Sequence, residues 1–116
     1  MSEDALHDRP TVAELVEAVR EFLERDVMPA TEGRLQFHAR VAVNVLGMVE
    51  RELELGPGQA VAHAEGLVRL GVADEAELAA SIRSGALDDR YDEVVDFVRQ
   101  TVRAKLEVAN PKYLES

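Results

Sequence analysis

The sequence has 116 residues, is 47% hydrophobic but only 4% aromatic, and carries a formal net charge of −10. A chain of this size can bury a hydrophobic core without the help of disulfides or metal ions. Its abundant alanine, leucine, glutamate and arginine favour helix. The acidic charge argues against nucleic acid and anionic lipid surfaces as partners, because both repel it. The absence of cysteine excludes disulfides, thiolate nucleophiles and cysteine-ligated metal sites.

The sequence predicts a short N-terminal tail followed by one domain. Residues 1–10 are predicted to form a mobile N-terminal tail, and residues 11–116 a single helical domain. The tail is acidic and lacks the apolar segment of a secretory signal. No apolar run approaches the roughly 20 residues needed to span a bilayer. We therefore expect a cytoplasmic protein that does not bind membranes.

The first predicted helix begins after Thr11, which can cap it, and Glu14 three residues later completes a capping box. Its apolar residues recur every three or four positions, which indicates one buried stripe. Pro29 is expected to mark its end. The stripe consists of Val12, Leu15, Val16, Val19, Phe22, Leu23 and Val27.

A second helix is predicted from Gly33 to Leu55 and a third from Gln59 to Leu70. The break between them is predicted from Gly56, which suits the position after a helix, and from Pro57, which cannot continue the hydrogen-bond ladder.

Two further helices complete the prediction. A short fourth helix follows Asp74 as its cap and ends at Gly85, and Asp88 or Asp89 is expected to cap a fifth helix that ends at Asn110–Pro111. No segment alternates with the period of two that strands require. The predicted fold is all-α, a single domain of about five helices in a bundle-like packing with a long central second helix.

The second predicted helix has an excess of apolar surface. Placed at 100° steps, its apolar residues span an arc of about 240°, whereas a surface helix needs only about 100°. The helix is therefore either central in the bundle or buried by a second copy, and we predict a homodimer. The arc contains Leu35, Phe37, Ala39, Val41, Ala42, Val43, Val45, Leu46, Met48 and Val49.

Five polar residues of this helix are candidates for a site. Arg34 and His38 fall inside the apolar arc. We predict that His38 is a buried structural histidine with a hydrogen-bond partner and that Arg34 extends over apolar surface to water; an anion- or acyl-binding patch and a contact between subunits are the alternatives. Arg40, Asn44 and Arg51 form a narrow polar stripe, predicted as a partner or ligand surface, with a solvated stripe as the alternative.

The sequence offers no recognisable catalytic or metal motif. There is no H-E-x-x-H, and His38 and His63 both lack the glutamate three residues earlier that bundle di-iron sites use. Ser81 and Ser84 are not in a nucleophile elbow, and the glycines of 56–58 are not followed by the lysine of a phosphate-binding loop. We therefore predict no catalytic, metal or cofactor-binding residues and no cofactor, and we favour a protein that is not an enzyme.

Two short patterns point to a family. Residues 37–44 follow F-H-x-R-V-A-x-N, and residues 106–114 follow L-x-V-x-N-P-[KR]-Y-L. With these, the sequence resembles a family of small bacterial proteins that carry a domain of unknown function. Its members are often encoded beside phosphotransferases of the aminoglycoside-kinase type and acyl-CoA dehydrogenases, which implies a phosphotransferase-like kinase as partner. Lys112 and Tyr113 join Arg34 and His38 as secondary site candidates.

The expected function is that of a non-enzymatic helical accessory protein, which partners a phosphotransferase-like kinase in acyl-CoA-related metabolism. The alternative is a small-molecule module that binds an acyl group or an anion in a pocket between the second and fifth predicted helices. The segment 110–114 is expected to dock through Tyr113 and Leu114 rather than fray.

Overall fold

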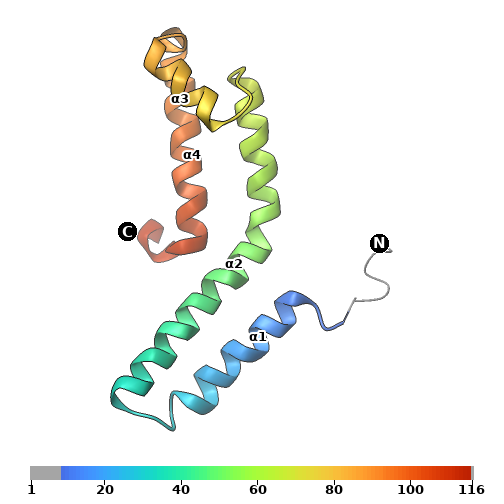
Figure 1. Cartoon of the computed structure of the whole chain (residues 1–116), viewed down its shortest axis with the longest axis vertical. Coiled ribbons are helices and arrows are strands. Elements are labelled where there is room, and N and C mark those ends of the chain that lie inside the picture. Colours follow the sequence, from blue (N-terminus) through green and yellow to red (C-terminus); the bar gives the residue numbers. More distant parts are fainter. Residues whose placement is uncertain (1–8, 116) are drawn as a thin grey trace. The chain divides into compact units, whose positions relative to one another are not determined.

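The computed structural model describes residues 9–115, and within them every regular element is helical. The predicted all-α class is thereby confirmed. The prediction for the N-terminal tail concerns mainly residues 1–8, which lie outside the described residues. Figure 1 shows the four α-helices: α1 (Val12–Phe22), α2 (Gly33–Arg69), α3 (Glu75–Ser84) and α4 (Tyr91–Ala109). None of them is long and apolar enough to cross a membrane.

The chain divides into two compact units, Met1–Glu54 and Leu55–Ser116, called here the N-terminal and the C-terminal unit. Helix α2 runs through the boundary. The prediction of a single domain over residues 11–116 stays a prediction.

In the N-terminal unit, α1 and the first part of α2 lie side by side as a hairpin (Figure 1). The predicted capping box is confirmed, since Glu14 N donates to Thr11 Oγ1 at 3.1 Å and Thr11 N donates to Glu14 Oε1 at 2.9 Å. A π-helical turn, Leu23–Val27, continues α1. The connection is then fixed by Gln36 Nε2, which donates to the carbonyls of Met28 (2.9 Å) and Thr31 (3.0 Å).

One ion pair joins the two helices of this hairpin. Arg20 Nε donates to Glu50 Oε1 at 2.5 Å, and Arg20 Nη1 donates to Glu24 Oε1 at 2.9 Å. The hydrogen bond to Glu50 is the main reason why the pKa of Arg20 is raised above its ordinary value. The pair fixes the side of α1 that faces α2.

The predicted break at Gly56–Pro57 is wrong, because α2 is one helix of 37 residues with Pro57 inside it. The chain therefore has four α-helices within its described part, where five were predicted. Proline removes one hydrogen bond, here the one to the carbonyl of Leu53. It also normally restricts the residue before it through that residue's Cβ. Gly56 has no Cβ, so this restriction is relieved and the helix continues.

The C-terminal unit contains the buried core. Asp74 caps α3 as predicted, accepting from Glu77 N at 2.8 Å, and Gly85 ends it in the left-handed conformation at φ 85°. The predicted aspartate cap of the next helix is wrong: a 3₁₀ turn, Asp88–Arg90, precedes α4, and no side chain caps α4. The core consists of Leu67, Leu70, Val72, Leu78, Leu87, Val94 and Phe97.

Candidate functional site

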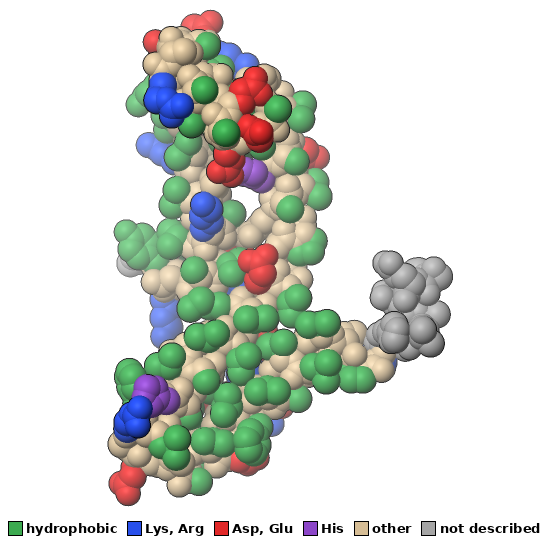
Figure 2. All heavy atoms as spheres, in the orientation of Figure 1, with side chains coloured by type: hydrophobic (Ala, Val, Ile, Leu, Met, Phe, Trp, Pro, Cys, Tyr) green, Lys and Arg blue, Asp and Glu red, His purple; other side chains and the backbone are tan. Residues whose placement is uncertain are grey.

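The most extensive candidate site is an exposed apolar surface on the N-terminal unit, called here the apolar face. Eleven large apolar side chains of α1 and the first part of α2 are each 37–62% exposed. Figure 2 shows hydrophobic side chains of both helices gathered on one side of the hairpin. The eleven residues are Val12, Leu15, Val19, Phe22, Leu35, Phe37, Val41, Val45, Met48, Val49 and Leu53.

The N-terminal unit has almost no interior of its own. Among its described residues, Ala39 alone is buried. Monomeric proteins seldom expose apolar patches larger than a few hundred Å², and larger ones mark interaction sites. Two helices that bury a single alanine between them also gain little hydrophobic stabilisation. The surface of this unit therefore resembles one side of a protein–protein interface.

The prediction that His38 is buried is wrong, since the residue is exposed on α2. Its ring contacts Phe37 edge-on, with centroids 5.7 Å apart. Arg34 is also exposed. The apolar arc that contains both residues is wider than the side that α1 covers. For this reason most of it faces outward, and His38 faces outward with it.

The predicted polar stripe does lie on one side of α2. Arg40 and Asn44 are exposed and one turn apart, as predicted. Arg51 is partly buried and makes a further interaction of its own, and its Nη1 lies 3.5 Å from the position a Cβ on Gly47 would take. The arginine therefore lies along the stripe in ordinary contact distance of position 47.

Lys112 and Tyr113 lie in the other unit, in the 3₁₀ turn Pro111–Glu115. Tyr113 N donates to Asn110 O at 3.0 Å, which orders the turn. The tyrosine side chain is 68% exposed, so the prediction that it is buried is wrong; Leu114 is partly buried.

A second candidate site is a cavity of about 230 Å³ in the C-terminal unit, called here the His63 cavity. Its wall is formed by the C-terminal part of α2 together with α3 and α4. The ring of His63 lies 5.0 Å from that of Phe97. The lining is mostly apolar: His63, Glu75, Leu78, Ala79, Ile82, Phe97, Val98, Thr101 and Val102.

The polar groups of this cavity converge on one imidazole. His63 Nε2 lies 2.7 Å from Glu75 Oε2 but is not aligned with it as a hydrogen bond, and it has no other partner among the described residues. Thr101 Oγ1 donates to Phe97 O at 3.0 Å and lies 3.4 Å from His63 Nδ1. Because the threonine proton is already used, its oxygen is placed to accept from the imidazole, and Thr101 is not set up as a nucleophile.

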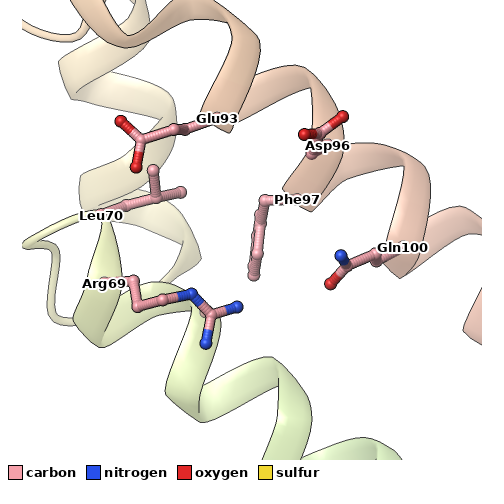
Figure 3. A pocket seen from close by; sticks show the side chains of 7 residues that line it. Arg69, Leu70, Glu93, Asp96, Phe97 and Gln100 are labelled. Atoms are coloured by element: carbon pink, nitrogen blue, oxygen red, sulfur yellow. The ribbon is translucent and has the colours of Figure 1, made fainter.

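A smaller cavity of about 180 Å³ lies on the other side of Phe97. Figure 3 shows the side chains of Arg69 and Gln100 reaching toward the Phe97 ring from two helices. Its rim includes Glu93, whose pKa is lowered chiefly by the hydrogen bonds it accepts from Arg90. Mixed charges at a shallow opening offer no single ligand class.

Sequence reasoning missed His63, Glu75 and Thr101 as a group, although a signal was present. His63 shares its side of α2 with the buried residues Leu67 and Leu70, at the spacing of one helix face. Thr101 follows the buried Phe97 by one turn of α4. A polar side chain in line with core residues on each of two helices favours a contact between them. Within the described residues, no three histidine or acidic side chains are grouped as a metal site requires.

Comparison with known proteins identifies the family and nothing narrower. No curated protein and no solved structure matches the chain. The family described as a domain of unknown function, DUF6285, matches residues 29–113. This range contains the pattern of residues 37–44 and all but the last residue of the pattern of residues 106–114. The chain therefore belongs to the DUF6285 family.

Proposed function

We propose that this chain is a non-enzymatic interaction protein of the cytoplasm, whose N-terminal unit is its binding element. The observation that carries the proposal is the apolar face on a unit whose described residues bury one alanine. An enzyme places its polar groups in a pocket, whereas this unit presents two helices with apolar side chains outward. Such a surface supports assembly with another protein.

The hairpin offers a second, polar surface for an accessory role. Arg40 and Asn44 are exposed at the edge of the apolar face of α2, where Asn44 lies two turns after Phe37 on nearly the same side of the helix. A partner at this edge would contact Arg40 and Asn44 beside the covered apolar face. A phosphotransferase-like kinase, the partner class that the family resemblance implies, would bind at Arg40, Asn44 and Arg51 in acyl-CoA-related metabolism.

The test is binding of the purified chain to a purified phosphotransferase of this type from the same host, by titration calorimetry. Binding by the wild type, weakened at least tenfold by Arg40→Ala with Asn44→Ala, supports the proposal. Glu17→Ala on the exposed outer side of α1 is the matched control. Equal affinity of the double variant and the control contradicts the polar stripe as the binding surface.

A second candidate function, a small-molecule module, is favoured by the His63 cavity. His63 Nε2 has no aligned hydrogen-bond partner, and the Glu75 carboxylate lies 2.7 Å from it, so a polar group of a ligand would compete with Glu75 for this nitrogen. The walls are apolar, and the nearby Glu75 carboxylate disfavours anions, so an uncharged acyl chain suits the space better. At about 230 Å³ the cavity is smaller than most drug-sized sites, which limits the ligand to a short chain.

Thermal shift measurements distinguish this candidate. A short-chain acyl thioester that raises the melting temperature of the wild type, but not that of His63→Ala, supports the module. An equal shift in both proteins, or no shift in either, contradicts it. The interaction proposal does not depend on this result.

A further inference from the structure

We propose that a second copy of this chain covers the apolar face, with the two α2 helices antiparallel and Arg34 of each copy paired with Glu52 of the other. The inference rests on the proposed interaction function and names its partner. It is carried by the charges and the spacing of side chains on α2.

Arg34 and Glu52 are opposite charges set among the apolar side chains of the same face. Both are exposed, and neither side chain makes an ion pair or hydrogen bond with any described residue. They are 18 residues apart, which is five complete turns of an α-helix and about 27 Å. The two charges therefore point in the same direction, near opposite ends of the exposed apolar arc.

A two-fold axis midway between them pairs the central apolar residues of α2 with one another. In an antiparallel pair with this axis, Arg34 meets the second copy's Glu52, and Val41 meets its Val45. Phe37 and His38 meet the second copy's Val49 and Met48, so the ring of His38 is covered by a thioether. The apolar residues at the centre of the face thus each receive an apolar residue or an imidazole from the other copy, whereas at its edge Leu35 meets Arg51 and Leu53 meets Gly33.

The parallel arrangement is disfavoured by the same charges. In a parallel pair, Arg34 of one copy would meet Arg34 of the other, and the two Glu52 side chains would likewise meet. Like charges that meet at an interface oppose association. An isologous antiparallel contact also closes on itself and leaves no unpaired surface for further growth.

The size of the face matches what a stable dimer needs. At roughly 90 Å² for each half-exposed apolar side chain, the eleven residues present on the order of 1,000 Å², and a standard interface buries about 800 Å² on each partner. The exposed stripe of α1 adds to the surface of α2, so two hairpins would form a four-helix bundle.

Cysteine cross-linking of the full chain tests the register, because the native sequence has no cysteine. Arg34→Cys and Glu52→Cys are made as separate variants and oxidised alone and as a re-equilibrated mixture. A covalent dimer that forms in the mixture and not in either variant alone supports the antiparallel pair. Covalent dimers formed by each variant alone indicate the parallel pair and overturn the inference.

Charge reversal tests the pairing without a new covalent bond. Arg34→Glu and Glu52→Arg should each raise the dimer dissociation constant about tenfold or more, and the double variant should recover most of the loss. Arg40→Glu and Glu17→Arg, on other sides of the hairpin, are the matched controls and should leave it within about twofold. No recovery in the double variant overturns the Arg34–Glu52 contact.

Light scattering separates failure of the inference from failure of the proposed function. A wild-type dimer at tens of micromolar supports the inference. A monomer that still binds the phosphotransferase overturns the second copy as occupant and leaves the interaction function standing. A monomer that binds no phosphotransferase overturns both.

Discussion

Phe97 is the residue on which the C-terminal unit depends most closely, because both cavities and the core share its ring. Gly66 makes its position possible: a Cβ there would lie 2.5 Å from Cδ1 and Cε1 of Phe97. The glycine lies in the last turn of α2, where it costs up to about 1 kcal/mol relative to alanine. The absence of a Cβ lets the Phe97 ring pack directly against the α2 backbone, and this packing offsets the cost.

Gly66→Ala is therefore expected to lower the stability of the protein by about 1–3 kcal/mol, as overpacked cores do. Gly58→Ala is the matched control, because nothing lies within 4 Å of a Cβ at that position of the same helix. It should raise stability by up to about 1 kcal/mol. Urea unfolding of the two variants checks both signs, and a stabilising Gly66→Ala would show that the ring does not lie against this glycine.

Glu93 gives the stability of the protein a pH dependence of known sign. Its pKa is lowered in the folded state, first by the hydrogen bonds from Arg90. Arg90 also donates to the carbonyl of Arg69 at 2.8 Å, which ties the 3₁₀ turn before α4 to the end of α2. A carboxylate with a lowered folded-state pKa stabilises the fold above its unfolded-state value and loses that contribution as the pH falls through the folded-state value.

We expect wild type to be more stable than Glu93→Gln at neutral pH, and the difference to shrink as the pH falls below about 4, near the ordinary pKa of glutamate. Chemical unfolding of both proteins across this range measures it. Glu65→Gln, an exposed glutamate without a partner among the described residues, serves as the control. A difference that stays constant with pH would contradict the assigned ion pair.

At the scale of the element, α2 is unusual because it keeps a proline near its middle. The missing hydrogen bond and the ring's clash with the preceding turn cost about 3 kcal/mol in an ordinary helix. Gly56 relieves only the separate restriction on the residue before a proline, so this cost remains. Pro57 lies beside the boundary of the two units. A weakened ladder at that place lowers the free energy needed to open the helix locally.

Pro57→Ala should consequently stabilise the protein, by up to about 3 kcal/mol, without loss of helical circular dichroism. The variant restores the donor to the Leu53 carbonyl and keeps the helix that the structure contains. Hydrogen exchange of residues 53–61 should slow in parallel. A lower melting temperature for Pro57→Ala would mean that the chain needs a break here, as the sequence pattern alone predicts.

At the scale of the whole molecule, stability is distributed unevenly. The described C-terminal unit has a cluster of seven buried residues, and the described N-terminal unit has one buried alanine. Short helices with little apolar burial are marginal in water. The N-terminal unit should therefore depend on its partner for much of its stability.

The apparent melting temperature should then rise with protein concentration, because association stabilises the folded state by mass action. A rise from about 1 to 100 µM adds roughly 2.3 kcal/mol when the lower concentration is near the dissociation constant. Calorimetry at the two concentrations measures it. Val45→Glu, which places charges at the centre of the apolar face, should remove the concentration dependence, and a wild type without any such dependence would contradict the assembly.

The sequence by itself determined much of the local structure. Thr11 with Glu14, Asp74 and Gly85 marked helix ends correctly, because capping depends on side chains within a few residues. The 240° apolar arc also indicated correctly that α2 has more apolar surface than one chain side requires. The polar stripe follows from helical spacing alone.

Only the tertiary structure decided the rest. The sequence could not show that α2 passes through Pro57, because a lost hydrogen bond is weighed against packing along the whole helix. It could not show that His38 is exposed, since burial depends on which side of the arc α1 covers. Nor could it place Glu75 and Thr101 at His63: these residues lie on three helices far apart in the sequence, and only their packing in the C-terminal unit brings them together.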